Sequence, residues 1–158
     1  FGLAQNLGIP RAEAKQIIDD YFGQFPGVRN YMDEMIGFCR TNGYIKTLMG
    51  RRRYLPDITS GNNTVRAQAE RIAINAPMQG SAADIIKVAM VNIHGDLKQR
   101  GMRSRLLLQV HDELVFDAHN DETDALKELV RDRMEGALAL DVPLVVDMAV
   151  GKNWLEAH

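Results

Sequence analysis

The chain has 158 residues, of which 46% are hydrophobic and 25% charged, a composition typical of globular proteins with a buried core. Its formal net charge of −2 argues against a general nucleic-acid coat, and its single cysteine, Cys39, excludes an internal disulfide and a cysteine-built zinc site. The chain has no apolar run of the roughly 18 residues that a membrane span needs, no signal peptide and no starting methionine, so we expect a segment cut from a longer protein that has no membrane partner.

Two helices are predicted in the first forty residues. Pro10 is well placed for the first turn of the first helix, and Pro26-Gly27 ends it. Asn42-Gly43 ends the second helix. The apolar residues at helical spacing are Ala14, Ile17, Ile18, Tyr21 and Phe22 in the first helix, and Val28, Tyr31, Met32, Met35 and Ile36 in the second.

Two short strands and a long helix follow. The strands are expected over Tyr44–Leu48 and Arg53–Leu55. Thr64 can cap an alanine-rich helix that ends near Arg100-Gly101. Pro77 lies inside this helix and predicts a kink, because proline removes one backbone hydrogen bond. The positions of Met32, Met35, Met78 and Met90 are those of core residues.

The last third of the chain predicts a hairpin, a helix and a final strand. Two apolar runs, Leu106–Val110 and Leu114–Phe116, are separated by only three polar residues, which indicates two buried strands and a short turn. An amphipathic helix is expected over Asp121–Leu140 and a strand over Leu144–Val150. The predicted fold class is therefore α+β, with long helices packed on a small, mostly antiparallel sheet.

The charges are distributed unevenly along the chain. Residues 40–71 contain seven basic residues and two acidic ones, whereas residues 112–147 contain eleven acidic residues and three basic ones. The basic region could contact phosphates, and the acidic region could contact metal or solvent. Two solvated faces would give the same pattern.

Two acidic residues, Asp112 and Glu113, occupy the tip of the predicted hairpin after His111. Hard cations such as Mg²⁺ take oxygen ligands from one or two carboxylates and keep other positions for water and substrate phosphate. A hairpin tip is stiff yet open, which suits that role. The alternative is an ordinary turn, because aspartate is common in turns.

A polar stripe lies on the long helix, where successive spacings of three, four and four residues place four side chains near one face: Gln68, Arg71, Asn75 and Gln79. Such groups can donate hydrogen bonds to the acceptors that every base pair presents in the minor groove, which would test base-pair shape without reading sequence. An exposed polar face is the alternative. Arg52, within Arg51–Arg53, could likewise hold a phosphate or belong to a solvated turn.

Together these motifs resemble the family A DNA polymerases, in particular their bacterial branch. Residues Gln109–Glu113 resemble the carboxylate motif of the palm, Glu70–Lys87 the long palm helix, and Gly43–Ile58 the hairpin before that helix. Gly151–Trp154 and the ending Ala157-His158 resemble the family's terminus. The resemblance covers essentially the whole chain, with its motifs in the family's order.

The resemblance implies a role in template-directed DNA synthesis. Residues 1–58 would form the last part of the fingers and residues 59–158 much of the palm. The primer 3′-hydroxyl would attack a deoxynucleoside triphosphate with the help of two Mg²⁺ ions. Asp112 would bind metal directly, Glu113 would support the metal site, and His111 would lie against the primer end. Arg71, Asn75 and Gln79 would contact the minor groove or the nascent pair.

The family's second metal-binding aspartate and its triphosphate-gripping helix have no match in this chain, although Phe1–Leu3 resembles the end of that helix. We therefore expect the 158 residues alone to be inactive. The resemblance also implies primer-template DNA and deoxynucleoside triphosphates as partners, a monomer, and a cytoplasmic, nucleoid-associated location. The alternatives are a non-catalytic DNA-binding remnant and a metal-dependent nuclease.

Overall fold

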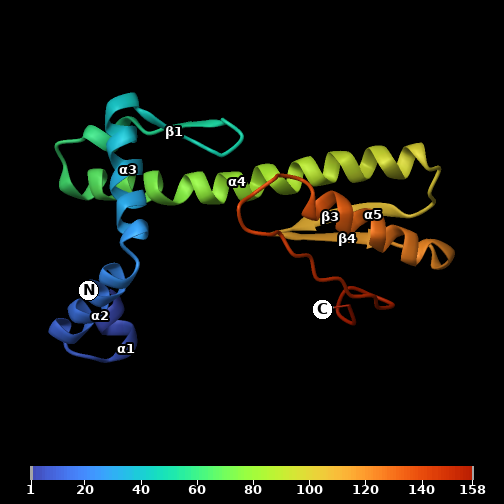
Figure 1. Cartoon of the computed structure of the whole chain (residues 1–158), viewed down its shortest axis with the longest axis horizontal. Helices are drawn as coiled ribbons and strands as arrows, with labels where there is room; N and C mark the ends of the chain where they lie inside the picture. The colour runs from blue at the N-terminus through green and yellow to red at the C-terminus, as the bar shows by residue number, and fades with distance from the viewer. Residues whose placement is uncertain (1, 158) are drawn as a thin grey trace. The chain divides into compact units, whose positions relative to one another are not determined.

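The computed structural model describes residues 2–157 and divides the chain into two compact units, Phe1–Met78 and Gln79–His158 (Figure 1). Phe1 and His158, which the resemblance includes at its two ends, lie outside the described residues. These two units are defined by how compactly each is packed. The predicted boundary after residue 58 is of another kind, because it divides the chain by function, and it stays a prediction.

The first unit combines helices with a small hairpin. Its elements are α1 (Gly2–Leu7), α2 (Arg11–Gln24), α3 (Pro26–Asn42), β1 (Tyr44–Lys46), β2 (Arg52–Tyr54), the 3₁₀ helix η1 (Pro56–Thr59) and the first part of α4 (Asn63–Gln99). Gly43 ends α3 in the left-handed conformation, with φ of 76°, which glycine adopts without steric cost. The core of this unit contains Cys39, Ile45, Leu55, Ile58, Ala69, Ala73 and Ala76.

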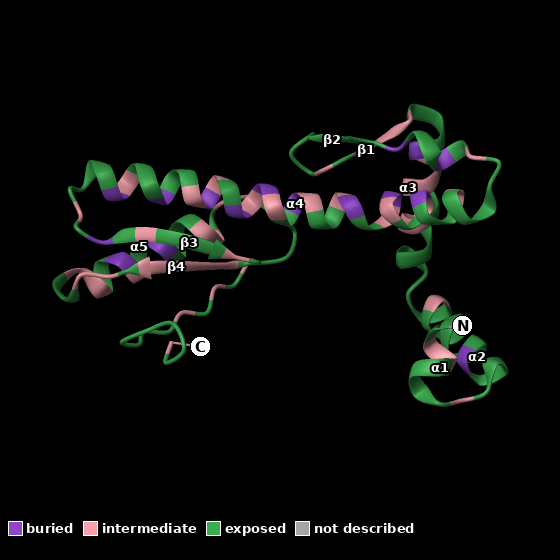
Figure 2. Cartoon of the chain, turned by 180° about the vertical axis from the view of Figure 1, so that it is seen from behind, coloured by how far each residue is buried: buried purple, intermediate pink, exposed green. Residues whose placement is uncertain are grey.

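The apolar face of α2 is more exposed than its sequence pattern predicts. The helix itself is confirmed, but Ala14 is its only buried residue. Ile17, Ile18 and Tyr21 remain 43%, 41% and 49% exposed, and most of α2 is coloured as exposed in Figure 2. Helical periodicity identifies an apolar face, but burial of that face requires a partner surface elsewhere in the fold.

The long helix α4 runs without interruption in its helical assignment from Asn63 through Pro77 to Gln99. Its cap is Asn62 rather than the predicted Thr64, because the Asn62 side-chain oxygen accepts a hydrogen bond from the Thr64 backbone N–H at 2.9 Å. Thr64 therefore lies in the first turn, and the predicted kink at Pro77 stays a prediction. Met78 is 67% exposed, so its expected core position was wrong.

The second unit packs the remainder of α4 and the helix α5 (Thr123–Glu135) with a hairpin of two strands, β3 (Arg105–Val110) and β4 (Glu113–Asp117). A 3₁₀ helix, η2 (Asn120–Glu122), leads into α5. The buried core contains Ala89, Ile93, Leu97, Leu126, Leu129 and Val130. In this unit α5 ends at Glu135, five residues before the predicted Leu140.

The predicted strand over Leu144–Val150 is wrong: the structure assigns no strand there. A strand needs a neighbour for its backbone hydrogen bonds, and among the described residues the sheet of this unit consists of β3 and β4 alone. The Val146 N–H instead donates to the Glu135 carboxylate at 3.1 Å. With its helices and two small antiparallel sheets, the fold is α+β, as predicted. Among the described helices none is long and apolar enough to cross a membrane.

Candidate functional site

The tip of the β3–β4 hairpin is a tight two-residue turn. Val110 and Glu113 form the last pair of the ladder, which leaves His111 and Asp112 in the turn. His111 has φ of 53°, the only positive φ of a non-glycine residue among those described, and such backbone conformations cost free energy in an L-residue. The Gln109 side-chain amide, at the end of β3, donates to the His111 carbonyl at 2.7 Å and so holds the turn.

The carboxylates of the tip differ in exposure. Asp112 is exposed, and Glu113 is half-buried at the start of β4. Carboxylate oxygens are ligands that hard cations prefer, and Mg²⁺ commonly takes only one or two of them from a protein. The donor set therefore fits part of a magnesium site. In the part of the chain that the structure describes, no group of three or more histidine, cysteine or acidic residues could hold a metal ion.

The polar stripe on α4 is accessible to a ligand. Gln68, Arg71, Asn75 and Gln79 are all exposed. The structure brings two of them together, since the Arg71 guanidinium donates a hydrogen bond to the Gln68 side-chain oxygen. The first three residues belong to the first unit, whereas Gln79 opens the second unit, which also carries the tip residues 111–113.

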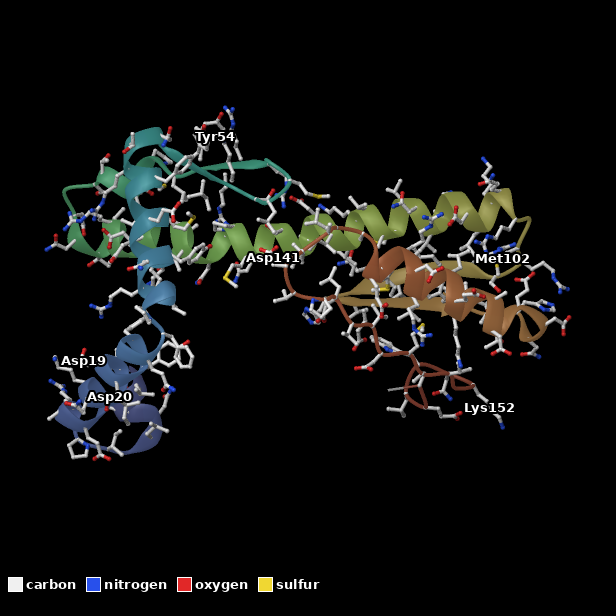
Figure 3. The ribbon with its side chains drawn as sticks, viewed as in Figure 1. Asp19, Asp20, Tyr54, Met102, Asp141 and Lys152 are labelled. Carbon is white, nitrogen blue, oxygen red and sulfur yellow. The ribbon has the colours of Figure 1, made fainter. Side chains whose placement is uncertain are left out.

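Arg52 lies on the exposed strand β2, where it stacks on an aromatic ring. Its guanidinium carbon is 4.7 Å from the centroid of the Tyr44 ring, and the Lys46 ammonium nitrogen is 5.8 Å from the same centroid. The neighbouring Tyr54, labelled in Figure 3, is 68% exposed and contacts the Tyr44 ring edge-on. A stacked guanidinium still presents donors at its edge, so this hairpin offers a positive and aromatic surface to an anionic polymer.

The largest pKa shift among the acidic residues lies at the other end of the β3–β4 hairpin. Hydrogen bonds from the Arg103 backbone N–H and from the Ser104 hydroxyl and backbone N–H lower the pKa of Glu122 to about 2. Sequence reasoning gave Glu122 no role. Eighteen residues separate it from Ser104, and no local spacing pattern links the two.

The comparisons with known proteins agree over almost the whole chain. The family described as DNA polymerase family A matches residues 1–156. DNA polymerase I of Bacillus subtilis (strain 168) is 53% identical over 157 residues, which are 99% of this chain and 18% of that protein. DNA polymerase I of Streptococcus pneumoniae (strain ATCC BAA-255 / R6) is 52% identical over the same shares. The chain thus spans about a fifth of the length of these relatives.

One solved structure has a fold similar to that of this chain and a related sequence. It is the POL domain of Pol1 from M. smegmatis in complex with DNA primer-template and dNTP. The TM-score is 0.97 at 52% sequence identity, and the match covers 99% of this chain and 28% of that one.

Proposed function

The chain belongs to DNA polymerase family A, and we propose that it contributes part of the fingers and much of the palm to a DNA-directed DNA polymerase. In this proposal residues 1–58 belong to the fingers and residues 59–158 to the palm. The match of the family over residues 1–156 supports it, as does the likeness to a polymerase domain bound to primer-template and dNTP.

The proposed reaction is nucleotidyl transfer in DNA replication or repair. The 3′-oxygen of the primer forms a bond to the α-phosphorus of a deoxynucleoside triphosphate, and the bond from that phosphorus to the bridging oxygen breaks. Pyrophosphate leaves with that oxygen, and the hydroxyl proton passes to solvent or to a neighbouring base. Primer-template DNA and deoxynucleoside triphosphates are therefore the proposed partners.

Family A DNA polymerases are generally metal-dependent, and the finer proposal here is two Mg²⁺ ions. When bound, the ions would favour ionisation of the primer hydroxyl and stabilise negative charge on the phosphates. Asp112 is the proposed direct ligand, because its carboxylate is exposed at a stiff tip. Glu113 supports the site from the start of β4, and His111 contacts the primer end. These three are the proposed catalytic residues.

The exposed stripe on α4 is the proposed contact with the duplex. Arg71, Asn75 and Gln79 donate to minor-groove acceptors or to the nascent pair, and Gln68 orients the Arg71 guanidinium through their hydrogen bond. Arg52 on the β1–β2 hairpin contacts the phosphate backbone. These contacts hold any base pair of correct shape, which template-directed copying requires.

In this proposal the metal site also needs residues outside this chain. A single carboxylate cluster does not hold two cations about 4 Å apart, and none of the residues here matches the family's second aspartate. The 158 residues alone are therefore proposed to be inactive. The complete enzyme is proposed to act as a monomer, in the cytoplasm and with the nucleoid.

The observation that carries the proposal is the exposed Asp112 at the hairpin tip of a chain that matches the family end to end. The test is Mg²⁺-dependent primer extension by the longest polypeptide that contains this chain, here called the parent polypeptide. Asp112→Asn is expected to slow extension at least about 100-fold, the equivalent of roughly 3 kcal/mol of transition-state stabilisation, while it still binds primer-template.

Asp117→Asn is the matched control, because Asp117 is an exposed aspartate at the opposite end of β4. It is expected to extend primers at nearly the wild-type rate. Equal extension by wild type and Asp112→Asn would refute the metal assignment. A wild-type polypeptide that binds DNA without extending it would favour the DNA-binding remnant, and Mg²⁺-dependent cleavage without use of triphosphates would favour a nuclease.

A further inference from the structure

We propose that Glu122 and Ser104 are positioning residues for Asp112, because together they clamp the open end of the hairpin that carries Asp112 at its tip. The inference rests on the proposed function, since it assigns these residues a part in metal-dependent extension. All the residues involved lie in the second unit, where α5 lies beside β3 and β4 (Figure 1).

The clamp on β3 is a carboxylate that accepts several hydrogen bonds. The two oxygens of Glu122 each lie 3.0 Å from the Arg103 backbone nitrogen. One of them also accepts from the Ser104 backbone N–H at 2.9 Å and from the Ser104 hydroxyl at 2.7 Å. Ser104 is 3% exposed and directly precedes β3, so these bonds fix the point at which the strand starts.

Ser104 also holds the segment that follows β4, the second strand of the hairpin. The Ser104 hydroxyl oxygen accepts a hydrogen bond from the backbone N–H of His119 at 3.0 Å, two residues after the end of β4. One hydroxyl thus donates to Glu122 and accepts from the backbone beyond β4. Ser104 thus links three segments by hydrogen bonds: the start of β3, the residues after β4 and the residue before α5.

This joint adds to the contacts that define the register of the hairpin, in which Leu114 and Phe116 pack against the core of the unit. A two-stranded hairpin is marginally stable by itself, and a slip of one residue turns every side chain to the other face. The ladder already contains an irregularity between Leu106 and Leu108. A clamp at the base fixes which residues form the turn, and therefore keeps Asp112 rather than a neighbour in it.

The electrostatics support a clamp that is present at neutral pH. The same hydrogen bonds that hold the pKa of Glu122 at about 2 keep it ionised under physiological conditions. Hydrogen bonds to a charged acceptor are roughly twice as strong as neutral ones. Glu122 also precedes the first turn of α5, where a negative charge interacts favourably with the helix dipole.

The test compares three variants of the parent polypeptide. Glu122→Gln removes the charge and one acceptor, and Ser104→Ala removes the shared hydroxyl. The control, Asp121→Asn, removes a charge from the adjacent exposed residue, whose carboxylate lies 3.3 Å from the Arg103 guanidinium and 3.7 Å from the His119 imidazole. Both contacts are to side chains, whereas Glu122 and Ser104 hold the backbone at both ends of the hairpin. Primer extension is measured as a function of Mg²⁺ concentration, and hydrogen exchange of residues 105–117 is measured in metal-free protein.

Both clamp variants are expected to raise the half-saturating Mg²⁺ concentration about three- to tenfold, less than the roughly 10- to 100-fold typical of direct partners of metal ligands. Exchange in the hairpin is expected to accelerate in both, whereas Asp121→Asn stays at wild-type values. A loss of folded protein would lower the rate equally at every Mg²⁺ concentration and leave half-saturation unchanged.

Unchanged half-saturation in both clamp variants would overturn the inference even where the rate falls. If the wild-type polypeptide shows no Mg²⁺-dependent extension, the proposed function fails, and the exchange data still decide whether the clamp holds the hairpin. Wild-type exchange rates in both variants would show that it does not.

Discussion

The hydroxyl of Tyr31 on α3 donates a hydrogen bond to the backbone carbonyl of Ile74 on α4, at 3.2 Å. The contact lies in the turn of α4 that precedes Pro77. Proline has no N–H, so the carbonyl four residues before it, that of Ala73, lacks its usual helical donor. Tyr31 therefore adds a hydrogen bond from α3 to the turn of α4 next to the one that lacks the proline N–H.

Tyr31→Phe is expected to destabilise the protein by about 1 kcal/mol, because it removes this hydrogen bond and keeps the ring. The hydroxyl is the donor at neutral pH, since burial, and secondarily Glu34, raises the pKa of Tyr31 above its ordinary value. The measurement is the free energy of unfolding in urea. Tyr21→Phe is the control: Tyr21 is 49% exposed, and the variant keeps its ring contacts, so a change under about 0.5 kcal/mol is expected. Equal effects of the two variants would contradict the assigned role of Tyr31.

Arg71→Ala in the parent polypeptide is expected to slow primer extension about tenfold, because it removes the proposed donor to the minor groove. The acceptor can be removed separately by a primer that carries a 3-deazapurine, in which carbon replaces N3. Wild type should extend this primer more slowly, whereas Arg71→Ala should not lose further rate, since the same hydrogen bond is already absent. Lys98→Ala, an exposed cation near the end of the same helix, serves as the control. Additive losses from the variant and the deazapurine would exclude this contact.

The stability of the protein is expected to fall in acid because of Glu122. Its pKa in the folded protein, about 2, lies below its ordinary value of 4.5, so its contribution is complete above about pH 4.5 and is lost as the pH falls toward 2. Urea unfolding of wild type and of Glu122→Gln at pH about 6 and about 3 checks this, because glutamine does not titrate. Wild type should lose more stability than the variant across this interval. An identical loss in both would assign acid sensitivity to other carboxylates.

Local sequence patterns determined most of the helices and both hairpins. Helical spacing placed α2 and α3, and the paired turn residues Asn42-Gly43 and Arg100-Gly101 marked two helix ends, because these signals act within a few residues. The motifs around Arg71 and Asp112 also sufficed to identify the family, which the match over residues 1–156 confirms. The roles assigned to those residues remain predictions.

The tertiary structure decided which segments with a strand or helix pattern have a neighbouring strand or an apolar surface to pack against. Leu144–Val150 has the composition of a strand, but a ladder requires a neighbouring strand that the described residues do not supply. The apolar face of α2 is likewise correctly patterned and yet largely exposed. The joint between Ser104, His119 and Glu122 depends on a chain reversal that brings distant residues together, and local sequence carries no signal for it. Periodicity and turn chemistry act over a few residues, whereas strand pairing, burial and shared hydrogen bonds depend on what the rest of the fold places alongside.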